Sequence, residues 1–343
     1  MKLGLALQWD GQRLDIPLAK IQRAEALGFD SVWCAEAYGS DAITPLAFIA
    51  AHTEKIRLAT GIIQVAARSP TATAMAMATL DQLAGEGRAI AGLGLSGPQI
   101  VEGWYGQPWG SPYHKLRDYV QIMKKVWRRK GPVKHEGKEY QLPFDGERAL
   151  GVGKPLKSIL HCNPDIPIWL GTGSETNVIL TAEIADGWLP MGFVPGATEQ
   201  YRPWLERGFT QAGNGKSYQD FHIQAAAQVN LCEAVQAGLD ALKPFAAFYV
   251  GGMGHKDKNF HKEMMIRRGF PEAAEKIQAL FLAGKRDEAA KAVPDEYLDQ
   301  GALIGPADRI RGKLGEWQGI GVDGLTLHGA SDEAMRVIAD YVH

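Results

Sequence analysis

This sequence of 343 residues has few cysteines, a small net charge and no long apolar run. Its three cysteines, Cys34, Cys162 and Cys232, lie far apart, which argues against a disulfide framework or a zinc site and predicts reduced thiols in the cytoplasm. The formal net charge of −2 gives no basic field for a nucleic acid, so we expect a small-molecule partner. No stretch approaches the roughly 20 apolar residues of a membrane span, and the N-terminal apolar run is too short for a signal peptide.

Several catalytic signatures are missing as well. The nine histidines are scattered, and none forms the His-x-x-x-His pair that metal sites often use. The sequence has no Cys-x-x-Cys pair, no Gly-x-Ser-x-Gly elbow and no P-loop. These absences argue against a zinc enzyme, a serine hydrolase of the elbow type and a P-loop nucleotide hydrolase.

Strand and helix patterns alternate from the first residues onward. Short apolar runs predict buried strands, and apolar residues at three- and four-residue spacing predict helices. The first four pairs of strand and helix are 3–7 with 14–27, 31–34 with 45–51, 56–63 with 71–83, and 89–95 with 114–127. Repeated units of this kind predict right-handed crossovers and a parallel sheet.

The alternation continues to the end of the chain, which favours a closed barrel over an open sheet. The remaining strands are expected at 168–170, 187–191, 221–231 and 322–328, with helices after the fifth, sixth and eighth of them. Eight units predict an α/β fold of the (β/α)8 TIM-barrel type, whose usual size is about 250 residues. We assign the surplus to two insertions, a hairpin at 135–142 and a helical segment at 251–301. No linker bounds either insertion, so residues 1–343 are expected to form a single domain.

The stretch from Pro167 to Pro190, PIWLGTGSETNVILTAEIADGWLP, contains the most informative turn. It predicts a strand, a glycine turn and a helix, and free N–H groups at such a helix N-terminus bind anions such as phosphate. A second interpretation stays open, because Thr172 and Glu175 have capping-box spacing and the glycines could serve only a tight turn. The third glycine of a dinucleotide fingerprint is missing, since Thr176 stands in its place.

In a TIM barrel the functional residues lie at the carboxyl ends of the strands. Glycines at three of these ends could let a flat ligand approach the backbone, or could only relieve packing at bends of the barrel. Glu36 is the carboxylate best placed for acid or base chemistry, although it could equally order its loop by accepting backbone N–H groups. The other candidates for ligand contact are Gln8, Trp9, Ala37, Gly61, Ile62, Gln64, Gly94, Ser96, Gly171, Thr172, Gly173 and Ser174.

Six segments together resemble the luciferase-like monooxygenase superfamily, and within it the deazaflavin-dependent branch that uses coenzyme F420. They are GFDSVW with AEAYGSDA, LATGIIQVAARSP, GLGLSGPQIVEGW, AEIADGWLP, YVGGMG and ALIGPADRI. The resemblance implies a bacterial-luciferase-like (β/α)8 barrel with the deazaflavin ring at the strand ends, over a non-proline cis peptide at Gly61-Ile62. It also implies a coenzyme phosphate on the loop from Gly171 to Ser174, and a homodimer.

The sequence departs from this family at the acid and base positions. In the sugar-phosphate dehydrogenase branch an Asp-His pair follows strand two, where this chain has Glu36-Ala37, and a glutamate stands where this chain has Gly97-Pro98. Glu102 is a candidate substitute for the missing proton donor. We therefore predict an F420-dependent oxidoreductase that passes a hydride between the deazaflavin and a small organic substrate. The alternatives are an FMN-dependent monooxygenase of the same fold and a non-catalytic flavin- or deazaflavin-binding protein.

Overall fold

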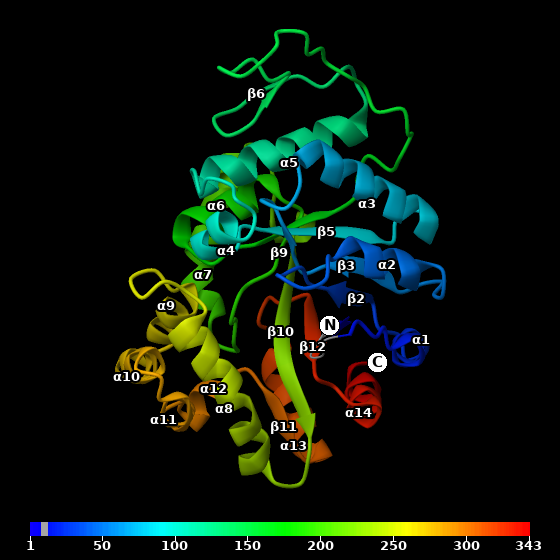
Figure 1. Ribbon diagram of the computed structural model, residues 1–343. Helices are drawn as coiled ribbons and strands as arrows, with labels where there is room; N and C mark the ends of the chain where they lie inside the picture. The colour runs from blue at the N-terminus through cyan, green and yellow to red at the C-terminus, as the bar shows by residue number, and fades with distance from the viewer. Residues whose placement is uncertain (8–12) are drawn as a thin grey trace. The chain divides into compact units, whose positions relative to one another are not determined.

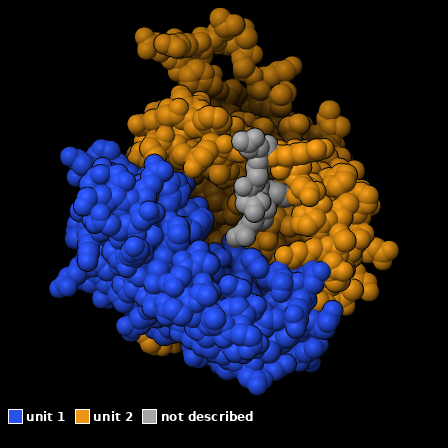
Figure 2. All heavy atoms as spheres, turned by 60° about the horizontal axis from the view of Figure 1, so that its bottom comes forward, with its two compact units in different colours: residues 1, 191–198, 225–343 blue, residues 2–190, 199–224 orange. Residues whose placement is uncertain are grey.

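The computed structural model describes residues 1–7 and 13–343 of the chain (Figure 1). Two compact units can be distinguished within it (Figure 2). Unit 2 contains residues 2–190 and 199–224, and unit 1 contains residue 1 with residues 191–198 and 225–343. The single-domain organisation expected from the sequence stays a prediction. Among the described residues, no helix combines the length and the apolar character that crossing a bilayer requires.

Unit 2 is built on parallel strands that pair in the order of the sequence. Each strand pairs with the next along the chain, from β1 through β2, β3, β5 and β8 to β9, and β9 pairs with the start of β10. These strands are β1 (Lys2–Ala6), β2 (Ser31–Cys34), β3 (Arg57–Thr60), β5 (Ala89–Gly94), β8 (Ile168–Gly171), β9 (Gly187–Trp188) and β10 (His222–Leu231). The parallel sheet predicted from the strand-helix alternation is therefore present.

One predicted strand is divided in two. The apolar run 56–63 forms β3 and a separate short strand, β4 (Ile63–Gln64), which pairs with β5 through Gln64 and Gly94. The prediction of one continuous strand was wrong because the chain turns at Gly61 and Ile62, whose connecting peptide bond is cis. The interruption lies at a strand end, where the functional residues were expected.

The helices of unit 2 follow the predicted alternation, with two short additions, α4 and η1. They are α1 (Leu18–Ala26), α2 (Ile43–Ala50), α3 (Pro70–Ala84), α4 (Pro98–Gly103), α5 (Pro112–Arg128), α6 (Glu175–Ile184), α7 (Thr198–Ala212) and the 3-10 turn η1 (Tyr218–Asp220). The sequence encodes α3 clearly, because the Ser69 hydroxyl accepts from Ala72 N–H, Pro70 opens the first turn and Gly85 ends the helix at a φ of 95°. The short helix α4 was missed, since its six residues show no clear periodicity.

The centre of unit 2 is aromatic. Trp33 of β2 and Trp169 of β8 have ring centroids 5.4 Å apart, and Ala59 and Ile90 pack beside them in a fully buried cluster. The His222 ring stacks on Trp169 at 4.3 Å. Strands that are buried on both faces need apolar side chains throughout, which explains why they appear in the sequence as continuous apolar runs.

The predicted hairpin at 135–142 is present in unit 2. Strands β6 (His135–Glu136) and β7 (Gln141–Leu142) pair antiparallel, and the buried carboxylate of Asp118 on α5 holds them. One Asp118 oxygen lies 3.1 Å from His135 Nε2, and the other accepts hydrogen bonds from the N–H groups of Glu139 and Tyr140. Lys125 of α5 adds a second contact, because its Nζ donates to the Lys134 carbonyl at 2.8 Å, so side chains of α5 fix the hairpin at its first strand and at its turn.

Unit 1 contains the remaining strands and a helical cluster. The end of β10 pairs in parallel with β11 (Leu303–Gly305), and β12 (Gly324–His328) follows. The helices are α8 (Val235–Gly252), α9 (Phe260–Arg267), α10 (Pro271–Leu282), α11 (Arg286–Lys291), α12 (Asp295–Asp299), α13 (Ala307–Trp317) and α14 (Asp332–Val342). The segment predicted as helical at 251–301 contains α9 to α12, and α10 and α11 share a buried cluster with α8 that includes Val250, Ile277 and Ala289.

Candidate active site

The predicted site residues of unit 2 are brought together at the carboxyl ends of β2, β3, β5 and β8. Sheet register places Cys34 beside Thr60, and Gly94 beside both Gln64 and Gly171. Two hydrogen bonds continue this pairing into the loops, from Gly61 N–H to the Cys34 carbonyl at 2.8 Å and from Glu36 N–H to the Ile62 carbonyl at 3.1 Å. Gln8 and Trp9 lie outside the described residues.

The Gly61-Ile62 peptide bond is cis, as the family resemblance implied. The Ile62 side chain packs against the backbone of the two neighbouring strand ends. A Cβ atom on Gly94 would lie 2.8 Å from Ile62 Cδ1, and one on Gly171 would lie 3.1 Å from Ile62 Cγ2. At these two positions the structure supports the packing interpretation of the glycines, because the space that a side chain would need is filled by Ile62.

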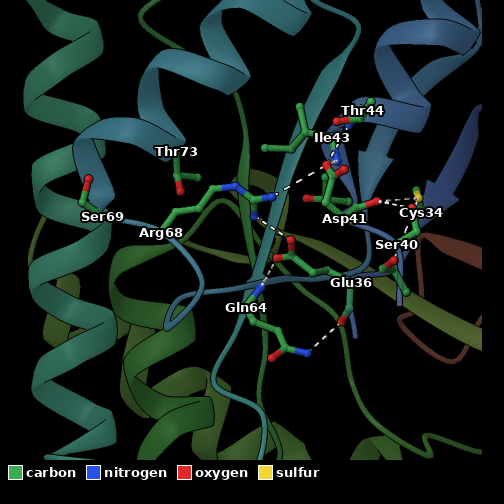
Figure 3. Close-up of polar contacts among 12 residues, drawn as sticks. Cys34, Glu36, Ser40, Asp41, Ile43, Thr44, Gln64, Arg68, Ser69 and Thr73 are labelled. Carbon is green, nitrogen blue, oxygen red and sulfur yellow. Dashed lines mark hydrogen bonds and ion pairs between the residues drawn. The ribbon is translucent and has the colours of Figure 1, made fainter. Parts of the chain in front are cut away.

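Glu36 is buried, and each of its two carboxylate oxygens contacts a donor of the protein (Figure 3). Oε2 accepts from the Gln64 backbone N–H at 3.0 Å, and Oε1 lies 2.6 Å from Arg68 Nη1. The Gln64 side-chain Nε2 donates to the Glu36 carbonyl at 2.8 Å. Both carboxylate oxygens of Glu36 therefore contact donors that belong to the segment 64–68. The geometry therefore matches the second sequence interpretation, in which Glu36 orders its loop.

Arg68 is the site residue that the sequence did not reveal. Its guanidinium lies between Glu36 and Asp41, at 3.7 Å from Asp41 Oδ1, so it ties together both ends of the loop that follows β2 (Figure 3). Burial tends to raise the pKa of Asp41, but hydrogen bonds from Thr44 and Ile43 together with the charge of Arg68 bring it below its usual value. No sequence motif marks Arg68, because its two partners lie about 30 residues earlier in the chain.

The loop from Gly171 to Ser174 leads from β8 into α6, as predicted. The helix is capped at Ser174, and Thr172 does not act as the N-cap of a capping box with Glu175. The Thr172 hydroxyl instead pairs with Thr181 at 2.8 Å, and its carbonyl accepts from Trp188 Nε1 at 2.9 Å. The Ser174 side chain makes no cap hydrogen bond. The backbone N–H groups in the first turn of α6 therefore receive no acceptor from the N-cap side chain.

The segment after β5 carries the remaining candidates. Ser96 is half-buried and has a φ of 59°, a left-handed conformation that is uncommon outside glycine. Glu102 is exposed on α4. Tyr105 follows α4 and is half-buried, and its pKa is raised by burial and by the nearby charge of Glu36. A phenol with a raised pKa stays neutral at pH 7 and can donate a hydrogen bond.

Comparison with known protein families assigns the chain to one of them. Residues 1–324 match the model of a family described as luciferase-like monooxygenase. The chain belongs to the luciferase-like monooxygenase family. This confirms the resemblance inferred from the six segments, and it identifies the chain as an oxidoreductase of that family.

Individual relatives of this luciferase-like protein cover nearly its whole length. A Mycobacterium tuberculosis protein, provisionally named a coenzyme F420-dependent oxidoreductase, is 44% identical over 100% of this chain and 99% of its own. The 5,10-methylenetetrahydromethanopterin reductase of Archaeoglobus fulgidus is 28% identical over 88% of this chain and 86% of its own. The solved structure of the coenzyme F420-dependent tetrahydromethanopterin reductase from Methanopyrus kandleri is similar with a TM-score of 0.79 and 25% identity, over 99% and 97% of the two chains. The predicted (β/α)8 TIM-barrel fold is confirmed.

Proposed function

We propose that this luciferase-like protein is a coenzyme F420-dependent oxidoreductase that transfers a hydride between the deazaflavin ring and a small organic substrate. The observation that carries the proposal is the match along the whole chain to the mycobacterial relative that is named for this coenzyme. The strand ends of unit 2 support it, because they offer backbone and small side chains to a flat ring. Ala37 and Gly61 are exposed there, and Ile62 and Ser96 are half-buried.

The residues of unit 2 fit such a coenzyme at two places. The first turn of α6, which lacks a side-chain cap, suits a phosphate, because free N–H groups and the helix dipole both favour an anion. Gly61, Ile62 and Ser96 would contact the ring, while Gly171 to Ser174 would hold the phosphate. When bound, the deazaflavin supplies the hydride chemistry as a two-electron carrier. The protein's own part is to bind, to orient and to exclude water.

The proton chemistry available at this site favours an activated acceptor. Glu36 is held by Arg68 and Gln64, so each of its carboxylate oxygens already has a donor within the protein, and the side chain positions the corner between β2 and β4. Tyr105 is close enough to sense the charge of Glu36 and is a hydrogen-bond donor that could polarise a substrate. A reductase acting on an enone or an imine needs less acid catalysis than a dehydrogenase acting on an alcohol. We therefore place enone and imine reduction ahead of alcohol oxidation.

Titration with both coenzymes tests the proposal. We expect F420 to bind at least ~10-fold, or ~1.4 kcal/mol, more tightly than FMN. We also expect reduced F420 to be oxidised by an enone or imine under strictly anaerobic conditions, which can be followed by the return of deazaflavin absorbance. Tighter binding of FMN with oxygen-dependent turnover would establish the monooxygenase alternative. Tight binding of either coenzyme without turnover across a broad substrate panel would establish the binding-protein alternative.

The homodimer and the cytoplasmic location are part of the same proposal. The three widely separated cysteines of the sequence favour a reducing compartment over a disulfide framework. Support for the dimer comes from the segment 143–162 after the hairpin, whose large apolar side chains are unusually exposed: Phe144 59%, Leu150 89%, Val152 80%, Leu156 69% and Ile159 93%. Apolar surface of this density marks a contact site, and a second copy related by a two-fold axis would cover it with the same segment.

Molar mass in solution tests the dimer. Light scattering of the purified protein should give twice the chain mass of 37.3 kDa. The double variant Leu150→Ser with Ile159→Ser should move the mass toward the monomer. A wild-type mass of one chain at micromolar concentration would reject the dimer.

A further inference from the structure

One buried polar atom in the site, the side-chain oxygen of Gln64, has no partner within the described part of the chain. Among the residues that the structure describes, three buried side-chain atoms make no hydrogen bond, on Gln64, His135 and Asp295. His135 and Asp295 are nevertheless satisfied by ion pairs, with Asp118 at 3.1 Å and Lys243 at 2.6 Å. Gln64 Oε1 is left with neither kind of contact, although Gln64 is only 3% exposed. An unpaired buried acceptor destabilises the protein, so such an atom calls for an explanation.

The orientation of the Gln64 amide is determined by its neighbour. Its Nε2 lies 2.8 Å from the Glu36 carbonyl, which can only accept a hydrogen bond (Figure 3). If the amide were turned over, two acceptor oxygens would face each other, so Nε2 must occupy the position next to the carbonyl. Oε1 can therefore act only as a hydrogen-bond acceptor. Its partner must be an N–H or O–H donor that is not among the contacts of the described residues.

The residue that carries this acceptor stands among the predicted site residues. Gln64 pairs with Gly94 across β4 and β5, and the carbonyl that holds its amide precedes the exposed Ala37. The carboxylate of the same Glu36 fixes the Gln64 backbone, so that main chain and side chain are both positioned from β2. A group that is held so firmly but lacks a partner has the character of a preorganised binding contact.

We propose that Gln64 Oε1 is the acceptor for an imide N–H on the edge of the bound pyrimidinedione ring. The inference rests on the proposed function, since deazaflavins and flavins both carry this imide. It assigns Gln64 the role of a specificity-determining residue, because a site built around a committed acceptor rejects ligands that lack the matching donor. The contact does not distinguish F420 from FMN; it distinguishes rings with a free imide N–H from rings without one.

The test combines a change in the protein with a change in the ligand. Dissociation constants for F420 and for an F420 analogue methylated at the imide nitrogen are measured by fluorescence with wild type and with Gln64→Met. In the wild type, methylation should weaken binding ~10-fold or more, as expected for loss of one buried hydrogen bond. In Gln64→Met the ratio of the two dissociation constants should fall close to one. A purely structural role would weaken both ligands equally and leave the ratio unchanged, which would overturn the inference.

Gln82→Met is the matched control. Gln82 Nε2 also donates to a backbone carbonyl, that of His161 at 2.6 Å, but from α3 and away from the strand ends. This variant should keep the wild-type ratio, and a ratio near one in Gln82→Met would overturn the inference, because the effect would then not be specific to Gln64.

Two further measurements complete the test. If Gln64→Met does not fold, NMR of 15N-labelled ligand on the wild type replaces it: the bound imide proton should exchange slowly with water, and fast exchange would overturn the inference. If the wild type binds FMN and not F420, the proposed function fails, while the same ratio measured with FMN and its imide-methylated analogue still decides the role of Gln64. Binding of neither ring would overturn both.

Discussion

Arg68 Nη1 lies 2.6 Å from Glu36 Oε1, and this ion pair joins the segment that precedes α3 to the segment that follows β2. The Glu36 side chain is 4% exposed and the Arg68 side chain 25%. A pair with one buried partner cannot be broken on one side without leaving a charge or a donor unsatisfied. The pair therefore makes a prediction about stability as well as activity.

Replacing Glu36 by glutamine should destabilise the fold. The amide NH2 must face either the Arg68 guanidinium or the Gln64 N–H, so two donors meet in a buried place. We expect a loss of about 1–3 kcal/mol in the free energy of unfolding, measured by urea denaturation, together with weaker coenzyme binding. If Glu36→Gln leaves the free energy of unfolding unchanged and lowers turnover ~100-fold, Glu36 acts in proton transfer, as the sequence suggested.

Arg68→Met is the partner variant for a double-mutant cycle. If the ion pair is responsible, Glu36→Gln and Arg68→Met combined should be less destabilising than the sum of the two single changes. Additive effects would show that each residue acts through other contacts.

The packing of Ile62 on Gly94 predicts a second set of variants. Gly94→Ala should be destabilised by about 1–3 kcal/mol, because its Cβ would lie 2.8 Å from Ile62 Cδ1. Adding Ile62→Ala removes the atoms that clash and should recover much of the loss. Gly103→Ala on α4 is the control, since nothing lies within 4 Å of the added Cβ. Denaturation midpoints would check the series, and equal midpoints for Gly94→Ala and Gly103→Ala would contradict it.

The loop before α6 predicts a ligand-dependent effect. Gly173→Val should weaken F420 binding by about 10-fold, because a branched side chain keeps a phosphate from the backbone at the helix N-terminus. The deazaflavin nucleoside without the phosphate tail should bind wild type and variant alike. Fluorescence titration measures both ligands. An equal loss for the two would mean that Gly173 matters for the ring or for the fold and not for the phosphate.

Lys216 predicts a pH dependence. Burial lowers its pKa from 10.5 to about 8, against the opposing charge of Asp186, and its ammonium donates to the Ala185 carbonyl. Between pH 8 and 10.5 the unfolded chain binds more protons at this group than the folded chain, so its contribution makes the fold more stable as pH rises through that window. Lys216→Met should flatten this slope in urea denaturation, whereas Lys154→Met, at an exposed position, should keep it. A titration midpoint near 10.5 for Lys216 by NMR would contradict the prediction.

Many of the regular elements of unit 2 could be predicted because local patterns determine them, whereas α8 (Val235–Gly252), β11 (Leu303–Gly305) and α13 (Ala307–Trp317) of unit 1 were not expected. The apolar run 31–34 forms β2 (Ser31–Cys34), and the helix expected at 114–127 forms α5 (Pro112–Arg128). The division of 56–63 into two strands was not visible, because an uninterrupted apolar run predicts one strand equally well. The cis bond within it could be placed only through the family resemblance.

The sequence predicted where the candidate site lies better than it predicted the role of each residue in it. The strand-end rule brought Gly61, Gln64 and Gly94 to one place, since that rule depends only on the order of strands. The role of Glu36 depended on Arg68, and a contact between residues about 30 positions apart leaves no local pattern. The N-cap at Ser174 was displaced by two residues because the Thr172 hydroxyl found a buried partner in Thr181.

The packing of Ile62 against Gly94 and Gly171 also constrains how this scaffold can be redesigned. The three residues come from separate segments of the chain yet share one volume, so their sizes are interdependent. Consider a chimera that takes only the segment after β3 from a relative with a different side chain at position 62. That side chain would fit the relative's strand ends and would not fit Gly94 and Gly171 of this chain. Segments that end at β3, β5 and β8 are therefore best exchanged together, and combinatorial libraries at these positions should vary all three at once.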